Sequence, residues 1–178
     1  PPPLAFAVLR RELAGGPVPE AFRLIPAGEF RAPDGRPAEV AQWEMTDADG
    51  RRIVAEFAAR HNDGYIDYEH ATLLAKKTGQ TAPAAGWYAA LEWRPGDGLW
   101  ATGVQWVAAA AALIRERAYR YISPLFSYDV TTGRVLQLLG ASLTNDPGLD
   151  GLTHLAALAA QLFQPLTKDP QEMASPKL

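Results

Sequence analysis

The pattern of hydrophobic and polar positions along the chain is mostly that of short β-strands. Apolar or alternating runs bounded by turn residues predict extended segments at residues 4–9, 21–37, 65–70, 84–94, 98–106, 119–130 and 134–144. The sequence PGDG at 95–98 predicts a hairpin between the fourth and fifth of these segments. Pro124 lacks a backbone N–H, which limits how far the segment 119–130 can join a central ladder.

Three other segments have helical spacing or composition, namely 47–60, 107–118 and 149–163. Asp47 or Asp49 is expected to cap the first of them. The sequence AKKTGQTAP that starts at Ala75 is expected to be a loop. Because the hairpin signals imply antiparallel pairing, the fold class is predicted to be α+β, with a mainly antiparallel, barrel-like or strongly bent sheet and helices around it.

Residues 1–163 are predicted to form one domain, and residues 164–178 a polar, proline-containing linker. A hydrophobic content of 48% with five tryptophans can supply a sizeable core. The net charge of -3 points away from nucleic acid. The absence of cysteine excludes disulfides, cysteine nucleophiles and thiolate metal sites. No apolar run reaches the roughly 18 residues of a membrane span. The first residues lack both signal-peptide features and an initiator methionine, which suggests a trimmed or processed chain.

The stretch GYIDYEH, residues 64–70, raises the question of a metal or catalytic site, because the chain has only three histidines. Strand alternation would place His70 on one face, and Asp67 and Glu69 on the other. The two carboxylates are therefore expected to be solvated, and a shared metal site is disfavoured. No HExxH motif is present.

A hydrolase without cysteine needs a serine or threonine nucleophile and a base. Ser175 lies in the predicted linker, Ser142 is expected to be a buried hydroxyl bonded to the backbone, and Ser127 has no special context. Ser123, in the sequence YISP, is the better candidate, with His70 as its base. The competing interpretation is that His70 only bonds a backbone carbonyl. The GxSxG motif of the α/β-hydrolases is absent.

Five collinear segments resemble the phage Mu protein I family, the Mu-like prophage I proteins: IDYEHATL, APAAGWYAALEW, GLWATGVQW, YRYISPLFSYD and GASLTNDPGLDGL. This resemblance covers about residues 4–155 and implies a head maturation protease related to caudovirus prohead proteases and herpesvirus assemblins. It implies a β-barrel-like core with helices around it, Ser123 as the nucleophile and His70 as the general base. No cofactor or metal is expected to take part.

Assemblins carry a third catalytic residue in the late strand, and alignment with this family pattern puts Gly140 at that position. Glycine cannot orient an imidazole, so either the enzyme is a dyad of Ser123 and His70, or another group supports His70. Asn145, Asp146 and Asp67 are the candidates for that group. Residues 145–148 also fall where the resemblance places oxyanion-stabilising amides. The alternative is that these four residues only form the turn that caps the last helix.

The resemblance further implies substrates and a setting. The scaffold, the protease itself and the major capsid protein would be cleaved inside the assembling prohead, in the host cytoplasm, and the linker would lead towards a scaffold region. A homodimer through the alanine-rich helix is one arrangement that the resemblance suggests, and neither nucleic acid nor a membrane is expected as a partner. The rival hypothesis is a catalytically inactive, protease-like assembly module, which the glycine at position 140 favours.

Overall fold

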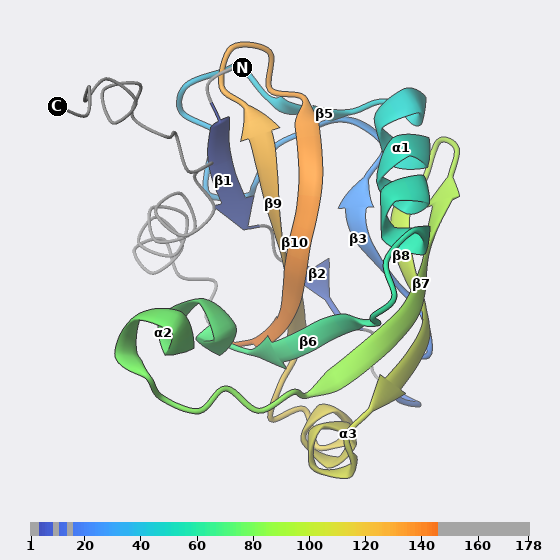
Figure 1. Cartoon of the computed structure of the whole chain (residues 1–178), viewed down its shortest axis with the longest axis vertical. Coiled ribbons are helices and arrows are strands. Elements are labelled where there is room, and N and C mark those ends of the chain that lie inside the picture. Colours follow the sequence, from blue (N-terminus) through green and yellow to red (C-terminus); the bar gives the residue numbers. More distant parts are fainter. Residues whose placement is uncertain (1–3, 9–10, 14–15, 146–178) are drawn as a thin grey trace, which may run out of the picture.

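The computed structural model describes residues 4–8, 11–13 and 16–145 of the chain (Figure 1). Its elements are, in order, β1 (Leu4–Val8), β2 (Arg11–Glu12), β3 (Phe22–Pro26), β4 (Gly28–Phe30), β5 (Trp43–Met45), α1 (Asp47–Ala58), β6 (Gly64–Tyr68), α2 (Ala71–Thr78), β7 (Gly86–Arg94), β8 (Gly98–Trp106), α3 (Ala108–Arg115), β9 (Tyr121–Asp129) and β10 (Val135–Thr144). The predicted helix at 149–163 and the predicted linker at 164–178 lie outside the described residues.

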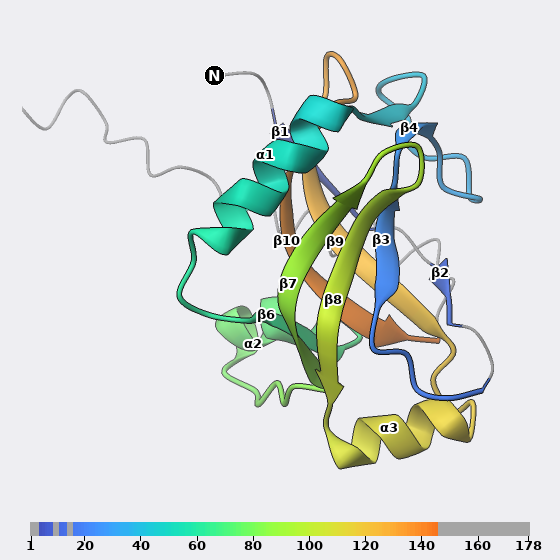
Figure 2. The same cartoon turned by 90° about the vertical axis from the view of Figure 1, so that its right-hand side faces the viewer.

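The main sheet has the strand order β1-β9-β10-β6-β7-β8-β3, with β2 also pairing with β9. All neighbours in it are antiparallel except β10 and β6, which run parallel. The sheet curls strongly into a half-barrel, so that β3 comes round towards β9 (Figure 2). The α+β class and the mainly antiparallel sheet are therefore confirmed. The described residues form an open, curled sheet with three helices rather than a closed barrel.

The concave side of the sheet holds the core. Its largest fully buried side chains are Trp43, Phe126, Leu24, Ile25, Met45, Ile66, Leu99, Ile122 and Leu143. Aromatic rings meet there edge to face, as between Trp43 and Phe126, whose ring centroids lie 5.2 Å apart. The alternating apolar positions of the strands supply this core, since every second residue of a strand points to the same side.

Two local predictions need correction. The segment 75–83, expected to be a loop, begins with the last four residues of α2, which runs to Thr78 and ends at Gly79 in the left-handed conformation, and only the rest of the segment is irregular. The cap of α1 is Thr46 rather than an aspartate, and its hydroxyl accepts the Asp49 N–H at 3.1 Å.

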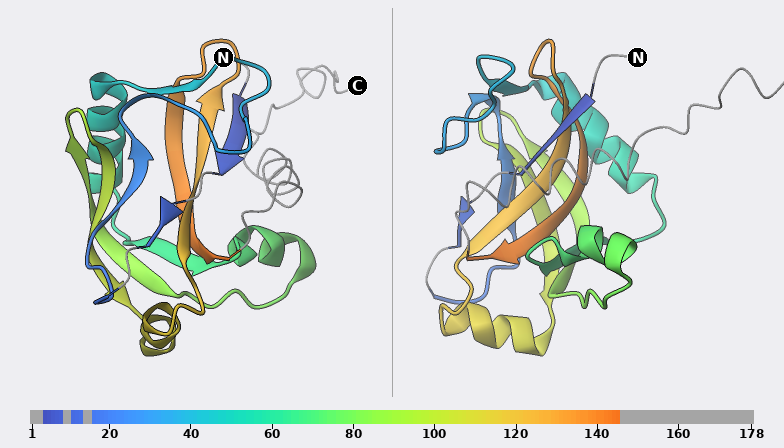
Figure 3. Two further views of the ribbon diagram at one scale, coloured as in Figure 1. Left: turned by 180° about the vertical axis from the view of Figure 1, so that it is seen from behind. Right: turned by 90° about the vertical axis from the view of Figure 1, so that its left-hand side faces the viewer.

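The strand that contains Pro124 lies inside the sheet, and its pairing is limited at the proline on one side, as the sequence predicts. β9 pairs with β10 along one side, and with β1 and β2 along the other (Figure 3). On that second side the described pairing stops at Leu125 with β1 and resumes at Ile122 with β2. Pro124 therefore falls where the described ladder is interrupted, which is where a missing N–H costs least.

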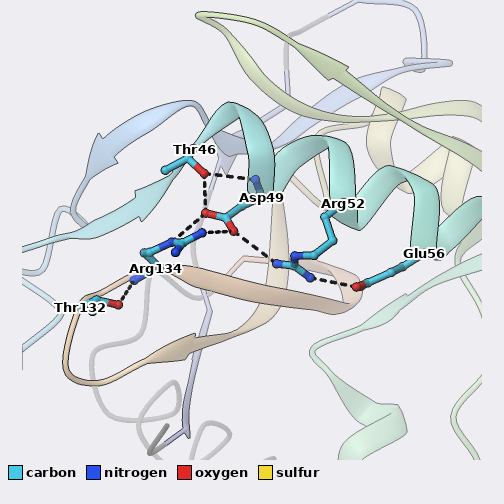
Figure 4. Close-up of polar contacts among 6 residues, drawn as sticks. All are labelled: Thr46, Asp49, Arg52, Glu56, Thr132 and Arg134. Atoms are coloured by element: carbon cyan, nitrogen blue, oxygen red, sulfur yellow. Dashed lines mark hydrogen bonds and ion pairs between the residues drawn. The ribbon is translucent and has the colours of Figure 1, made fainter. Parts of the chain in front are cut away.

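A buried carboxylate joins α1 to the start of β10 (Figure 4). Both oxygens of Asp49 accept from the Arg134 guanidinium, at 2.7 and 3.1 Å, and Thr46 donates its hydroxyl at 2.6 Å. Arg52 lies 3.5 Å from the same carboxylate and also pairs with Glu56 on the exposed side of the helix. Burial alone would raise the pKa of Asp49, but the contacts with Arg134 and Thr46 outweigh it and hold that pKa below its ordinary value.

We expect Asp49→Asn to lower the free energy of unfolding by about 1.5–3 kcal/mol at neutral pH, because charge-assisted hydrogen bonds are lost. A depressed pKa stabilises the fold above the unfolded value of about 3.9, and this stabilisation is lost as the pH falls through the folded value. The difference in the free energy of unfolding between the wild type and Asp49→Asn should therefore shrink below pH about 4. Urea unfolding at neutral and acid pH measures it. Glu56→Gln, on the exposed side of the helix, is the control and should change stability little; equal effects of the two substitutions would contradict the prediction.

Candidate functional site

The site forms where β6 ends and α2 begins. Glu69 and His70 both have positive φ, at 52° and 55°, so the chain leaves the extended conformation directly after Tyr68. His70 then occupies the N-cap position of α2. This turn lies beside the end of β10 (Figure 1), since Glu69 N–H donates to Leu143 O at 2.9 Å. The imidazole is thus placed by a left-handed turn and not by a strand.

Three polar residues lie side by side across three neighbouring strands. Ser142 of β10 pairs with Asp67 of β6 on one side and with Ser123 of β9 on the other. Residues directly opposite each other on adjacent strands point to the same face. All three are buried, with exposed fractions of 2% or less. A polar row across a sheet this well buried needs internal hydrogen-bond partners.

The His70 side chain supplies those partners. Its Nε2 lies 2.9 Å from Ser123 Oγ, and its Nδ1 lies 2.9 Å from Ser142 Oγ. The backbone N–H of His70 also donates to Ser142 Oγ, at 3.1 Å. Ser142 Oγ in turn donates to Asp67 Oδ1, and Asp67 Oδ2 accepts the N–H of Thr72 at 2.8 Å. The result is one continuous chain of hydrogen bonds from Ser123 to the first turn of α2.

Burial lowers the pKa of His70 to about 4, although the nearby Asp67 raises it in part. The imidazole is therefore neutral at neutral pH, and a neutral imidazole can accept a proton. His70 is only 4% exposed and Ser123 only 1%. The pair is thus shielded from bulk water in this conformation.

Asp67 was expected on the solvated face of a strand, and this is wrong. It is 2% exposed and reaches the histidine through Ser142. The alternation argument failed because it continued the strand through Glu69 and His70, where the backbone is left-handed. Glu69 is exposed, as expected, and accepts from Thr144 Oγ1 at 2.7 Å.

The alignment that put Gly140 beside the imidazole also needs correction. Gly140 pairs with Leu125, whereas the residue opposite Ser123 is Ser142. A Cβ at position 140 would lie 2.5 Å from the hydroxyl oxygen of Tyr65, which explains why a residue without a side chain fits there. Ser142 was expected to be buried and bonded to the backbone, and it is both, but its contacts with the imidazole and the carboxylate were missed.

Of the other two candidates for a third member, Asn145 makes its contacts elsewhere and Asp146 lies outside the described residues. The Asn145 side chain accepts the N–H of Arg120 at 3.1 Å and donates to Ala118 O. Its own backbone N–H donates to Glu69 at 3.2 Å. Asp146, and with it the proposed oxyanion loop, lies outside the described residues. The contacts of Asn145 therefore join β10 to the segment after α3.

Two other kinds of site are absent from the described part of the chain. No three of its His, Asp and Glu side chains gather closely enough to hold a metal ion. None of the helices described is long and apolar enough to cross a membrane.

The geometry matches the nucleophile and base of serine-dependent acyl transfer: a serine hydroxyl on one imidazole nitrogen and an orienting group on the other. The family of the chain is shown by its sequence. The family described as "Mu-like prophage I protein, N-terminal domain" matches residues 22–156 of the chain. The chain therefore belongs to this family.

Two relatives illustrate the relationship. "Protease I" of Escherichia phage Mu is 41% identical over 158 residues, which are 85% of this chain and 44% of that protein. "Mu-like prophage FluMu I protein" of Haemophilus influenzae is 34% identical over 166 residues, 89% of this chain and 46% of that protein. The chain thus spans slightly less than half the length of these relatives. No solved structure matches it, so the resemblance to the assemblin fold stays a prediction.

Proposed function

We propose that this chain is the peptidase part of a phage head maturation protease, with Ser123 as the nucleophile and His70 as the general base. The observation that carries the proposal is the 2.9 Å contact between Ser123 Oγ and His70 Nε2, made in a buried site. Membership in a family that includes a protein named Protease I supports the peptidase activity.

The reaction follows from the chemistry of the pair. Nε2 of His70 takes the Ser123 proton as the hydroxyl oxygen attacks the scissile carbonyl, and the tetrahedral intermediate collapses to an acyl-enzyme as the imidazolium protonates the leaving amine. Water then hydrolyses the ester, with the imidazole again taking a proton. The low pKa of His70 keeps the imidazole in its base form across the neutral range.

The substrates we propose are the phage scaffold protein, the protease itself and the major capsid protein, cleaved inside the assembling prohead in the host cytoplasm. Because Ser123 is only 1% exposed, a substrate carbonyl reaches its Oγ only after the residues over it move. The same burial is the observation that favours the second candidate function, a protease-like assembly module without activity.

Ser123→Ala decides between these two functions. We expect a fluorophosphonate, which forms a covalent adduct with activated serines, to label the wild-type chain at Ser123 and to leave the variant unlabelled. Co-expression with the phage scaffold and capsid proteins should give cleavage products with the wild type alone. Mass spectrometry reads both results.

Ser127→Ala is the matched control. Ser127 lies on the same strand, is 1% exposed, and its Oγ has no hydrogen-bond partner within the described residues. Losing this hydroxyl should leave labelling and cleavage as in the wild type. A wild-type chain that is neither labelled nor active would instead identify the inactive module, and cleavage by Ser123→Ala would rule out Ser123 as the nucleophile.

A further inference from the structure

We infer that Ser142 and Asp67 act as positioning residues that hold the neutral His70 imidazole in the one tautomer able to accept the Ser123 proton. The inference rests on the proposed function for its consequence, but the tautomer itself is a property of the structure. It assigns a role to Ser142, which the sequence left as a structural hydroxyl, and decides for Asp67 between a solvated carboxylate and a third member of the site.

The tautomer follows from the hydrogen-bonding capacity of Ser142. A serine hydroxyl has one proton to donate and two lone pairs to accept with. Three groups lie within hydrogen-bonding distance of Ser142 Oγ: the carboxylate of Asp67, the backbone N–H of His70 and Nδ1 of His70. An ionised carboxylate can only accept, so it takes the hydroxyl proton. Both remaining groups then have to donate, and Nδ1 therefore carries the ring proton.

The ionised state of Asp67 is supported at its other oxygen. Oδ2 accepts the N–H of Thr72 at 2.8 Å, in the first turn of α2. A backbone N–H can only donate, and the amino-terminal end of a helix favours negative charge. These contacts both stabilise the carboxylate form over the acid. With Asp67 ionised, the orientation of every hydrogen bond in the row is determined.

The consequence reaches Ser123 through the ring. When Nδ1 carries the proton, Nε2 has a free lone pair, which points at Ser123 Oγ 2.9 Å away. When the imidazole becomes charged during the reaction, Nδ1 continues to donate to Ser142, and Asp67 offsets the positive charge through that hydroxyl. Asp67 does raise the pKa of His70, against the larger lowering by burial.

The opposite tautomer can be produced by one substitution. In Asp67→Asn the amide oxygen should face the Thr72 N–H, because that N–H needs an acceptor, and the amide NH₂ should face Ser142. Ser142 Oγ then accepts from this NH₂ and from the His70 N–H, and its own proton goes to Nδ1. Nε2 now carries the ring proton and cannot accept one from Ser123. We expect the rate of fluorophosphonate labelling to fall roughly 10³–10⁴-fold, the size of effect that a wrong tautomer produces in serine proteases.

A second substitution should restore part of the rate. Ser142→Ala removes the hydroxyl that forces the wrong tautomer, so in the Asp67→Asn background the ring is free to adopt either form. We expect the double variant to be labelled at least about 10-fold faster than Asp67→Asn alone. If these two residues only stabilised the fold, the second substitution would slow the reaction further. Asp63→Asn, which changes an exposed carboxylate four positions before Asp67, is the control and should leave the rate unchanged.

The deciding measurement is ¹H–¹⁵N NMR of the histidine ring in the 178-residue chain, which reports the protonated nitrogen without any substrate. We expect the ring proton on Nδ1 in the wild type and on Nε2 in Asp67→Asn. Thermal unfolding shows whether both proteins are folded. Nε2–H in the wild type, or no change of tautomer in Asp67→Asn, would overturn the positioning role. Nδ1–H in a wild-type chain that fluorophosphonate never labels would support the positioning role and reject the proposed peptidase activity, so the two failures are distinguishable.

Discussion

His70→Ala should lower the rate of Ser123 acylation by about 10⁴–10⁶-fold, because removing either member of a nucleophile–base pair costs nearly as much as removing both. The contact that would be lost is the 2.9 Å hydrogen bond between Nε2 and Ser123 Oγ. Fluorophosphonate labelling at neutral pH measures the rate. Labelling of His70→Ala at the wild-type rate would show that the two side chains do not act as a pair.

The pH dependence gives an independent check on His70. Its pKa lies at about 4, so the base form is present throughout the neutral range. The rate should therefore be flat above pH about 5 and fall at lower pH, as the imidazole takes a proton. In the unfolded chain the pKa returns to about 6.5, so the stabilisation by the neutral ring is complete above that value and is lost as the pH falls towards 4. Circular dichroism at each pH separates the loss of rate from unfolding.

His61→Ala is the matched control for both measurements. His61 is exposed, follows the end of α1 and lines a hollow with residues of β7. Its removal should change neither the rate nor the acid limb. If the acid limb of the wild type lay near pH 6.5 instead, the imidazole would be more hydrated than the buried site implies.

Trp43→Ala should be the most destabilising of the substitutions considered, with a loss of about 3–5 kcal/mol in the free energy of unfolding. Trp43 is 1% exposed, and its ring lies 5.2 Å from that of Phe126 and 5.8 Å from that of Tyr128, both edge to face. Alanine would leave a cavity among aromatic groups that are held by strands on either side. Denaturant unfolding at neutral pH measures the loss.

Trp87→Ala is the control for this prediction, since Trp87 is 46% exposed on β7. It should cost less than about 1 kcal/mol, as surface substitutions commonly do. Because Phe126 lies on the same strand as Ser123, Trp43→Ala should also slow labelling at that serine. Equal losses of stability for the two tryptophan variants would contradict the assignment of Trp43 to the core.

Patterns that depend only on local sequence predicted much of the fold. The hairpin at PGDG, the strands around it and the helix α1 all appear where the alternation and the helical spacing place them. The helix α2 was missed because it has only eight residues and its cap is His70 without a side-chain hydrogen bond, so no capping signal precedes it. The limit that Pro124 sets on its ladder was predicted, but the side on which it falls depends on where β1 and β2 meet β9.

The two residues of the proposed reaction followed from the sequence, through chemistry and family resemblance together. The lack of cysteine, the scarcity of histidine and the sequence YISP pointed to Ser123 and His70. Asp67 was one of three candidates for a third member, and only the tertiary structure could select it and bring in Ser142. The two residues are 75 positions apart in the chain and meet through the parallel pairing of β6 with β10.

What the sequence determined by itself is therefore most of the elements and the residue types available for chemistry, because both depend largely on interactions between near neighbours in the chain. What the tertiary structure decided is which side chains share the site. A left-handed turn at Glu69 and His70 reversed the face on which strand alternation had placed the imidazole relative to Asp67. The register of three strands then aligned Asp67, Ser142 and Ser123. Register and backbone handedness are set by packing over the whole sheet, and no local pattern encodes them.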